Sequence, residues 1–543
     1  MDGFTWCSST LFQRLIPPFC LILIGLSQFA AAQSTGLPTG AIPNGLGVNI
    51  HFTDPRPGEI EMLAAGGFQW VRMDFAWERT EQIKERYDFA LYDRLMAVLK
   101  REGIRAVFIL DYSNPLYDEG KSPYTDEGRA AFAHWAAVAA KHFEGQCILW
   151  EMYNEPNIKF WRPAPKVEDY IKLALATGKA IKEFAPREIF IGPATSGIDL
   201  KFLEACFRAH LLDYWSAVSV HPYRQTAPET AAADCRNLRL LIRKYAPKGK
   251  RIPILSGEWG YSSAWTGMDP NRQGKMLARQ WLTNIANDIP LSIWYDWHDD
   301  GSNTKEPEHH FGTVFNAYNR AQTPVYDPKP AYRAAQAIVS NFGGFSFNKR
   351  LMLTGPDDYL LMFTRGEEVR LAAWTTSPRS HEISIPASPG SFRGFGFTGA
   401  KLRPLNADSG GLTVTLSDAP IYLIPERPND LLRIVSHWER APLEALIKGP
   451  GTVRLPANWR REYQWKLSSS PPDSFYVSPS DSVIPFVLTA KFGKAAAPVR
   501  LTAGIVKPAV PKGKKPPVES AALRNLWTEL SKFRQETYIV KPP

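Results

Sequence analysis

The sequence predicts a (β/α)₈ barrel followed by a small all-β sandwich domain and a C-terminal extension. Between Gly45 and Gly344, short apolar runs alternate with longer stretches whose apolar residues recur at helical spacing, which is typical of β-α units in a parallel sheet. Eight such runs can be counted, and eight strands are what this type of barrel requires. After Asn348 the apolar residues recur at every second position instead, which indicates antiparallel strands.

The eight expected barrel strands are rich in aliphatic, β-branched or aromatic residues, which favour strands. They are Leu46–Phe52, Trp70–Phe75, Ala106–Leu110, Ile148–Tyr153, Ile189–Ile191, Ala217–Val220, Ile252–Ser256 and Leu291–Tyr295. The expected helices include Tyr92–Lys100, Ala130–Phe143, Tyr170–Phe184 and Gly274–Ala286. A doubly wound open sheet is the alternative, but neither a G-x-G-x-x-G motif nor a P-loop follows the first strand.

After the barrel, the sequence pattern first predicts a β-sandwich and then becomes less regular. The expected sandwich strands are Tyr359–Thr364, Val369–Trp374, Glu382–Ile385, Leu412–Leu416 and Ile421–Ile424. Beyond Pro428 there are strand-like runs, a Pro/Lys-rich stretch and a helical pattern, at Val453–Leu455, Val483–Lys491, Pro508–Pro517 and Glu519–Phe533. We therefore expect a barrel at 33–345, a sandwich at 346–427, a second β module or loosely attached tail at 428–507, and a linker with a terminal helix at 508–543.

The N-terminus has the pattern of a signal peptide over residues 1–32. Arg14 precedes an apolar run from Leu15 to Phe29, and Ala30, Ala31 and Ala32 follow it, as at a small-residue cleavage site. A membrane anchor is the alternative, but the run is short for a span and has no basic residues after it. We expect cleavage near Ala32, a mature chain without a stable membrane span, and a secreted or periplasmic protein.

Composition and motifs exclude several other classes of protein. The net charge is +10, but the basic residues are spread along the chain except at Lys512–Lys515, so nucleic acid is not an expected partner. No nucleotide or redox motif is present, and we expect no cofactor. A polar cluster that could suggest a metal site lacks ligand spacing, so a polar loop at the rim of a cleft is favoured over a metal centre; its residues are Asp296, His298, Asp299, Asp300, Glu308, His309 and His310.

Two glutamates stand where a barrel of this kind carries its active site, at the C-terminal ends of strands. Glu155 follows the fourth expected strand and Glu258 follows the seventh. Pro156 stiffens the turn that holds Glu155. Hydrolysis of a glycosidic bond needs two such carboxyl groups, one to protonate the leaving oxygen and one to attack or to activate water. A single glutamate at a strand end is often merely solvated, so the matching positions of the pair carry the prediction.

With Asn154-Glu155-Pro156 after strand four and Glu258 after strand seven, the segment from Gly45 to Gly344 resembles the clan A glycoside hydrolases. It is most similar to families 39 (β-xylosidase-like) and 5 (cellulase-like). The resemblance implies that Glu155 is the general acid/base and Glu258 the nucleophile. It also implies hydrolysis with retention, and therefore carboxyl groups about 5 Å apart.

The same resemblance assigns supporting residues. Arg72, near the end of strand two, would steady the nucleophile. His221 and Tyr223, in a His-Pro-Tyr after strand six, would line the sugar site and contact the nucleophile, and Asn154 would bind the sugar 2-hydroxyl. The alternatives are that Arg72 pairs with Asp74 or Glu78 at the barrel rim and that His221 is a core residue. For function, the nucleophile must stay ionised, whereas Glu155 must start protonated, which calls for surroundings that raise its pKa.

Several tryptophans at strand ends suit a carbohydrate cleft, because sugar rings present apolar faces that stack on indole. The resemblance places a tryptophan at the end of strand eight under the sugar, for which Trp294 and Trp297 are the candidates, and Trp259 follows Glu258 directly. His51, at the end of strand one, is a further candidate for the same mouth. Any one of these aromatic residues is more often core packing than a ligand platform.

These observations predict a secreted glycosidase of the O-glycosyl hydrolase class (EC 3.2.1) that acts on an oligo- or polysaccharide with β linkages. The alternatives are a non-catalytic carbohydrate-binding barrel and a cell-surface or matrix glycan-binding protein. Retention of both Glu155 and Glu258 argues against the first alternative. The sequence does not identify the sugar, the linkage, the exo or endo mode, or the oligomeric state.

Overall fold

The computed structural model describes residues 36–437, apart from 352–355, 386 and 409–410, together with the backbone of six strands between residues 452 and 540. The chain divides into two compact units, with the boundary between Val339 and Ser340. The predicted signal peptide, the Pro/Lys-rich stretch and the predicted helix Glu519–Phe533 lie outside the described residues. Of the helices within the described ranges, none combines the length and the apolar character needed to cross a membrane.

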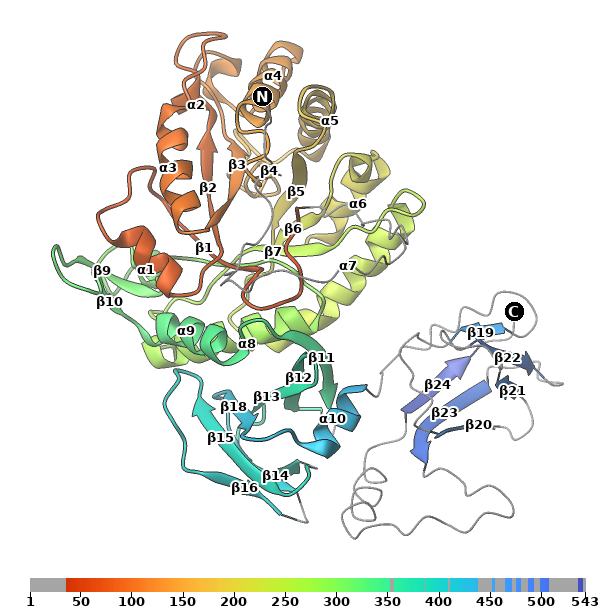
Figure 1. Ribbon diagram of the computed structural model, residues 1–543. Helices are drawn as coiled ribbons and strands as arrows, with labels where there is room; N and C mark the ends of the chain where they lie inside the picture. Colours follow the sequence, from red (N-terminus) through yellow and green to blue (C-terminus); the bar gives the residue numbers. More distant parts are fainter. Residues whose placement is uncertain are drawn as a thin grey trace, which may run out of the picture. The chain divides into compact units, whose positions relative to one another are not determined.

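The first unit is built on a closed barrel of eight parallel strands (Figure 1). The strands follow one another around the barrel in sequence order, and the eighth pairs with the first. All eight expected strands are present, so the predicted fold class is confirmed. Their bounds are β1 (Leu46–Asn49), β2 (Trp70–Ala76), β3 (Arg105–Asp111), β4 (Leu149–Met152), β5 (Ile189–Ser196), β6 (Val218–His221), β7 (Ile254–Trp259) and β8 (Ser292–Trp294).

Buried aliphatic side chains and one tryptophan form a core cluster of the barrel, to which seven of its eight strands or their flanking residues contribute. This cluster comprises Trp70, Val107, Leu149, Ile191, Ala217, Leu255, Leu291 and Ile293. Because successive residues of a strand point to opposite faces, every second residue is available for the interior of the barrel. The apolar residues of these strands therefore support the polar residues that follow at the C-terminal ends.

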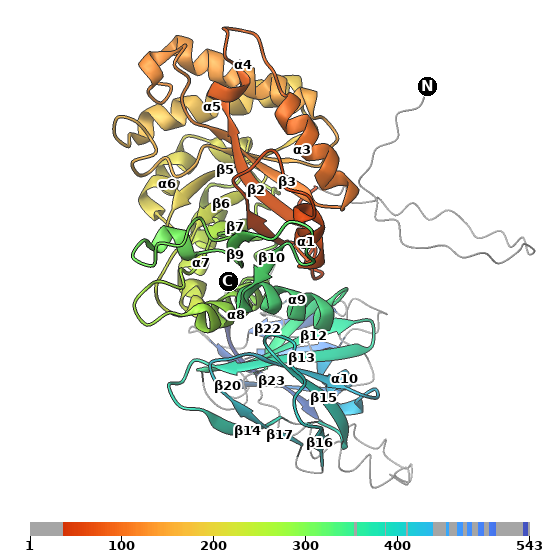
Figure 2. The same ribbon diagram turned by 90° about the vertical axis from the view of Figure 1, so that its left-hand side faces the viewer.

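Helices surround the barrel (Figure 2). They are α1 (Glu59–Ala65), α2 (Trp77–Thr80), α3 (Ala90–Arg101), α4 (Asp126–His142), α5 (Val167–Phe184), α6 (Leu200–Arg208), α7 (Ala231–Tyr245), α8 (Pro270–Ala286) and α9 (Pro330–Phe342). Three helix starts follow from capping residues, because the side chains of Thr125, Asp199 and Asp269 accept hydrogen bonds from the first turns of α4, α6 and α8. Short 3₁₀ turns lie at η1 (Asp118–Gly120), η2 (Leu211–Asp213), η3 (Pro228–Thr230) and η4 (Pro307–His310).

Two glycines beside Glu258 allow close contacts that a side chain would prevent. A Cβ atom at Gly257 would lie 2.2 Å from the Ser219 hydroxyl oxygen and 3.0 Å from Oε1 of Glu151. A Cβ atom at Gly260 would lie 1.9 Å from the carbonyl oxygen of Tyr295. The end of β7 therefore fits between its neighbours only because these two positions lack side chains.

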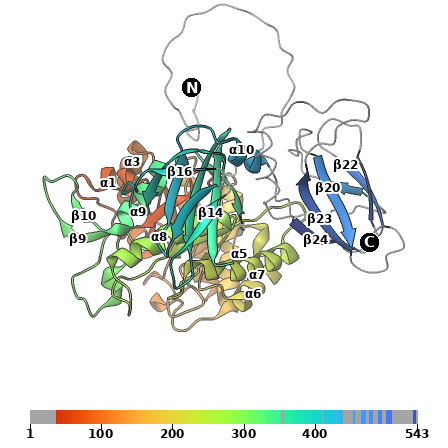
Figure 3. The same ribbon diagram turned by 90° about the horizontal axis from the view of Figure 1, so that it is seen from below.

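The second unit begins with a β-sandwich (Figure 3). One sheet has the strand order β11-β12-β13-β18-β15-β16, and β14 and β17 form the other. Their bounds are β11 (Ser346–Leu351), β12 (Asp358–Arg365), β13 (Glu368–Thr375), β14 (His381–Ile385), β15 (Gly390–Gly396), β16 (Leu405–Ala407), β17 (Leu412–Leu416) and β18 (Ile421–Pro425). Alternate residues of both sheets form one apolar core, which includes Leu371, Ile383 and Val414. The predicted sandwich is confirmed, and β11, β15 and β16 are additional to the expected strands.

The remaining elements are a hairpin of β9 (Val314–Tyr318) with β10 (Tyr326–Pro328), helix α10 (Asp430–His437) and two antiparallel sheets in the C-terminal region. These sheets have the orders β19-β22-β21 and β20-β23-β24. Their strands are β19 (Thr452–Arg454), β20 (Gln464–Ser470), β21 (Phe475–Pro479), β22 (Val487–Phe492), β23 (Val499–Val506) and β24 (Glu536–Val540). The two runs expected beyond Pro428 correspond to β19 and β22. The predicted domain bounds stay a prediction.

Candidate active site

The two predicted glutamates lie together at the C-terminal end of the barrel. One side-chain atom from each of Glu155, His221 and Glu258 lies within 4.8 Å of the other two. Glu155 follows β4 in a turn with a positive φ of 44°, and Glu258 lies in β7 where its register against β8 shifts. The side chains of Glu155 and Glu258 are 10% and 13% exposed, respectively. Both carboxylates are therefore nearly enclosed but still open to a ligand.

Arg72 of β2 connects most of the predicted residues. Its Nε donates to Oε2 of Glu151 at 2.6 Å, and its Nη1 donates to Oε2 of Glu258 at 2.6 Å. Its Nη2 donates to Oδ1 of Asn154 at 2.9 Å and lies 3.1 Å from Nε2 of His221. Burial alone would lower the pKa of Arg72, but the charges of Glu151 and Glu258 outweigh it and raise this pKa. Arg72 is therefore a permanent buried cation beside the nucleophile candidate.

The tautomer of His221 follows from its two neighbours. A guanidinium group can only donate hydrogen bonds, so Nε2 of His221 must accept from Arg72. The ring proton is then on Nδ1, which lies 2.9 Å from Oε1 of Glu155. His221 in this arrangement is neutral and donates to the carboxylate of Glu155. The imidazole thus joins the acid/base candidate to the same arginine that holds Glu258.

The surroundings of Glu155 differ from the sequence-based expectation. Burial is the largest single influence on Glu155 and by itself would raise its pKa, but the contacts with His221, Ser196 and Arg72 together outweigh burial and lower this pKa. The expectation that the surroundings raise this pKa is therefore wrong for the free protein. The expectation overlooked that His221, assigned to the sugar site and the nucleophile, also donates to Glu155.

Tyr223 and Asn154 complete the contacts around the two glutamates. The Tyr223 hydroxyl donates to Oε1 of Glu258 at 2.8 Å, and burial together with the charge of Glu258 raises the pKa of this hydroxyl well above its usual value. Asn154 is fixed on both sides, because its Nδ2 donates to the Tyr112 hydroxyl at 2.8 Å while its Oδ1 accepts from Arg72. Arg72, Asn154, His221 and Tyr223 are thus all brought to the two glutamates.

The three tryptophans expected to line the sugar site lie elsewhere. Trp259 and Trp294 are 0% exposed and Trp297 is 1% exposed. The indole nitrogen of Trp294 donates to the carbonyl of Phe311, and that of Trp297 donates to Glu59. None of the three offers an open ring face, so as sugar platforms they are not supported. They pack behind the site, which is the alternative that the sequence left open.

Other aromatic side chains occupy the mouth instead. Tyr295, the residue after Trp294, is partly exposed and lies 5.6 Å from the ring of His51 and 6.5 Å from the ring of Tyr223, measured between centroids. His51 itself is exposed and lies at the mouth as expected. Further partly exposed aromatic residues around the two glutamates or in the adjoining loops are Tyr112, Phe160 and Trp265.

Comparison with known proteins agrees with the barrel fold. Residues 39–301 match the family model described as cellulase (glycosyl hydrolase family 5). A family 39 glycoside hydrolase from Bacteroides cellulosilyticus WH2 has 24% identity and a TM-score of 0.62, with 72% of this chain and 82% of that chain covered. The chain resembles the clan A glycoside hydrolases.

Two further solved structures share this barrel fold. A family 39 β-xylosidase from Caulobacter crescentus has 16% identity and a TM-score of 0.52, with 72% of this chain and 98% of that chain covered. A family 30 endoxylanase from Clostridium papyrosolvens C71 has 10% identity, a TM-score of 0.52 and the same two coverages. Among curated proteins, none matches the sequence.

Two buried carboxyl groups of the barrel were not expected from the sequence. Glu151 of β4 is 0% exposed and binds Arg72, while Asp111 at the end of β3 is also 0% exposed. Burial and then the charge of Asp74 raise the pKa of Asp111 well above its usual value. A glutamate inside the apolar run of β4 is itself a signal, because a buried charge needs a partner. That signal could have linked Glu151 to Arg72.

The loop after β8 is only partly the polar rim that the sequence predicts. Asp296 and Asp299 are buried, and Asp300 is exposed. Asp299 accepts hydrogen bonds through its Oδ1 from Nζ of the buried Lys329 at 2.8 Å and from the backbone nitrogen of Gly312 at 2.9 Å. Burial raises the pKa of Asp299 and lowers the pKa of Lys329. This pair therefore fixes the loop from inside.

Proposed function

We propose that this chain is an exported retaining glycosidase that hydrolyses β-linked glycosides or polysaccharides, with Glu258 as nucleophile and Glu155 as general acid/base. The observation that carries the proposal is the placement of the two carboxylates within 4.8 Å of one another with different partners. Retaining enzymes hold their carboxyl groups about 5 Å apart, whereas inverting enzymes need about 6.5 Å or more to admit a water molecule.

The partners of Glu258 suit a nucleophile. Arg72 at 2.6 Å and the Tyr223 hydroxyl at 2.8 Å both stabilise the ionised carboxylate. In the first step Glu258 forms a bond to the anomeric carbon while the glycosidic C–O bond breaks and Glu155 gives its proton to the leaving oxygen. The charge of Glu258 is lost in this ester, and Arg72 then retains Glu151 as its charged partner.

The partner of Glu155 suits the second step. His221 donates to Glu155 and stabilises its ionised form, which is the form that takes a proton from the water attacking the anomeric carbon. Since this contact lowers the pKa of Glu155, the free enzyme holds the required acid only at low pH. We therefore expect kcat/KM to fall as the pH rises through the pKa of Glu155, and thus an acidic optimum.

Covalent trapping tests the roles of the two glutamates. The mature protein is incubated with a panel of 2-deoxy-2-fluoro glycosides, and its peptides are mapped by mass spectrometry. We expect one sugar of the panel to label the peptide that contains Glu258, and to label nothing in Glu258→Gln. Labelling at another residue would exclude Glu258 as the nucleophile. No labelling by any sugar, together with no hydrolysis of β-glycosides, would favour a carbohydrate-binding barrel.

A second experiment addresses Glu155. Glu155→Ala should lose roughly 10²- to 10⁴-fold in kcat on substrates with poor leaving groups. Added azide should restore part of the rate and yield a glycosyl azide of the same anomeric configuration as the substrate. Unchanged activity, or a product of inverted configuration from the wild type, would contradict the proposal. Export is tested separately, by sequencing the N-terminus of the protein recovered outside the cytoplasm, which should begin at Gln33.

A further inference from the structure

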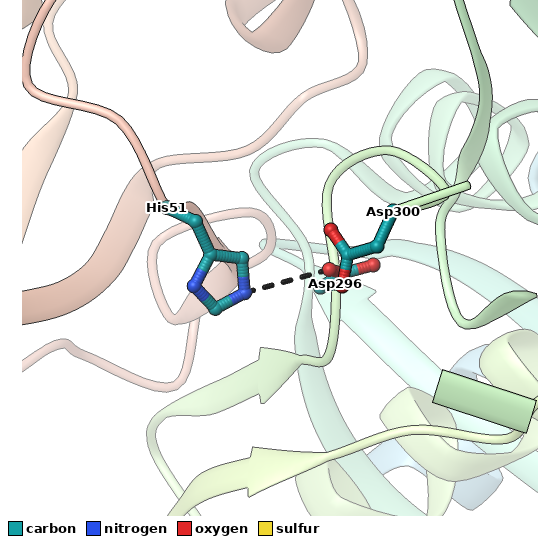
Figure 4. Close-up of side chains that lie close together, drawn as sticks. All are labelled: His51, Asp296 and Asp300. Atoms are coloured by element: carbon teal, nitrogen blue, oxygen red, sulfur yellow. Dashed lines mark ion pairs between the residues drawn. The ribbon is translucent and has the colours of Figure 1, made fainter. Parts of the chain in front are cut away.

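A second cluster of one histidine and two carboxylates lies at the mouth of the barrel (Figure 4). His51 follows β1, and Asp296 and Asp300 follow β8, which is the neighbour of β1 in the closed barrel. One ligand-capable atom of each residue lies within 4.8 Å of the other two. We call these three residues the rim cluster. In the sequence, Asp296 and Asp300 stand among other polar residues of their loop, far from His51.

Asp296 has an unsatisfied oxygen at the base of the rim cluster. Its side chain is 2% exposed, and Oδ1 is buried without a hydrogen-bond partner in the part of the chain that the structure describes. Its Oδ2 lies 3.5 Å from Nε2 of His51. Buried carboxylate oxygens without donors are rare because they lose hydration without compensation. The orphaned oxygen therefore points to a partner that the protein does not itself supply.

The spacing of the rim cluster fits a bound ion better than a hydrogen bond. The separation of 3.5 Å between His51 and Asp296 exceeds the usual N–H···O distance of about 2.7–3.2 Å. Two ligands at about 2.0–2.2 Å from one tetrahedral zinc ion lie about 3.4 Å apart. The side chain of His51 is 44% exposed and Asp300 is exposed, so an ion can enter and keep a water ligand.

We propose that His51, Asp296 and Asp300 bind a divalent transition-metal ion of the zinc class. The donor set decides the class of ion. One imidazole nitrogen with two carboxylate oxygens suits zinc and similar ions, whereas calcium and magnesium prefer oxygen ligands alone. Three protein ligands leave at least one position of the metal open. Such an ion ties the end of β1 to the loop after β8, one aromatic ring (Tyr295) away from Tyr223.

The other histidine-carboxylate cluster of the barrel, Glu155–His221–Glu258, does not compete for this assignment. Both ring nitrogens of His221 are already engaged, one with Glu155 and one with Arg72. The guanidinium of Arg72, 2.6 Å from Glu258, would repel a metal cation. Within the described part of the chain, no arginine forms an ion pair with the rim cluster. Metal binding therefore belongs at the rim.

Calorimetry with zinc chloride alone as the probe tests the inference. The mature, tag-free protein is first freed of metal with a chelator and then titrated in wild-type form and as His51→Gln and Asp300→Asn. We expect one site per wild-type chain, with affinity reduced by roughly tenfold or more in each variant. Both substitutions are at exposed positions, and unchanged thermal unfolding of the metal-free variants verifies that they fold. Excess calcium or magnesium should not displace the zinc.

Two matched controls assign the site. His142→Gln removes an exposed histidine that also contacts an aspartate, Asp93, at 2.8 Å, and Glu258→Gln alters the other cluster. Both should bind zinc as the wild type does. The proposal is overturned if the wild type binds no zinc stoichiometrically, or if His51→Gln and Asp300→Asn bind it unchanged. It is equally overturned if Glu258→Gln abolishes binding, or if calcium binds as tightly as zinc.

Discussion

The mouth of the barrel contains two clusters with the same residue types, one histidine and two carboxylates, but different surroundings. In Glu155–His221–Glu258, Arg72 contacts both Glu258 and His221, and both ring nitrogens of His221 are engaged. In the rim cluster, the buried carboxylate of Asp296 has an oxygen that finds no hydrogen-bond partner among the described residues. The cluster that contains Arg72 as a neighbour is thus arranged for proton transfer and nucleophilic attack. The rim cluster has no such cation of its own in the described part of the chain and is arranged to bind one from solution. Substitutions in and around the two clusters test this difference.

Replacing Arg72 should have the largest effect. Arg72→Met leaves the buried Glu151 and the nearly enclosed Glu258 without their cation, which should cost about 3–5 kcal/mol of unfolding free energy. We expect activity to fall roughly 10³-fold or more, as for other groups that stabilise charge in a transition state. Urea denaturation and kcat/KM measure the two effects, with the exposed Arg187→Met as control. A variant of wild-type stability would contradict the central role given to Arg72.

Replacing His221 should change the pH profile. His221→Asn removes the hydrogen bond that lowers the pKa of Glu155 and leaves burial, which raises it. The high-pH limb of kcat/KM should therefore move to higher pH, with a loss of roughly 10- to 100-fold at the optimum. The pH dependence of the unfolding free energy should change as well, because it also depends on the pKa of Glu155. A carboxylate with a lowered folded pKa stabilises the protein above its unfolded pKa, and this stabilisation is lost as the pH falls through the folded value.

The wild type should consequently lose more stability on acidification than His221→Asn does. Unfolding free energies at several acidic pH values, and kcat/KM across the same range, measure both expectations. A limb that stays in place or moves to lower pH in the variant would show that His221 does not control the charge of Glu155.

The two neighbouring aromatic residues at the end of β8 should have different roles, Tyr295 in substrate binding and Trp294 in stability. Tyr295→Ala removes a partly exposed ring at the mouth and should raise KM roughly tenfold, the value of one aromatic contact. Trp294→Phe changes a buried ring and should lower stability by about 1–2 kcal/mol while leaving KM unchanged. Steady-state kinetics and thermal unfolding of both variants decide. The reverse result would restore Trp294 as the sugar platform.

The rim cluster should contribute least to the hydrolysis itself. In a buffer with a chelator, Asp300→Asn should keep kcat/KM within about twofold of the wild type, as exposed substitutions usually do. Any change of kcat/KM on addition of zinc should then be seen in the wild type and not in Asp300→Asn. A large loss of activity in the metal-free variant would mean that Asp300 contacts the substrate directly, and the two clusters would no longer be separate sites.

Most of the barrel could be predicted because its strands are short, continuous apolar runs, whereas apolar residues recur every three or four positions in the helices between them. Glu155 and Glu258 could be placed for the same reason, since strand ends of a barrel converge on one face. Arg72, His221, Asn154 and Tyr223 needed the family resemblance, because nothing in their spacing says which side chains meet. The three tryptophans were misplaced because composition does not say whether a ring at a strand end points to the mouth or into the packing behind it.

The rim cluster was missed although topology implied it. His51 and Asp296 are far apart in the sequence, yet a closed barrel puts the residues after its first strand beside those after its last. Because the first and eighth strands are neighbours in a closed barrel, the polar residues that follow them are neighbours too, and this predicts that His51 lies near Asp296. The neutral tautomer of His221, in contrast, depends on distances that no pattern of residue types contains.

The buried pair of Asp299 and Lys329 bears on how such a protein could acquire a new substrate. Asp299 is held by Lys329 and by the backbone of Gly312, and the carbonyl oxygens of Pro307 and His310 accept hydrogen bonds from Ser262 and Gln273. Residues 302–306 are exposed between these anchors, so exchanges of sequence or length there would leave the barrel and the two glutamates in place. Selection or an engineer could therefore exchange the exposed part of the loop after β8, and so alter the sugar preference of the proposed glycosidase without changing the position of Glu155 and Glu258.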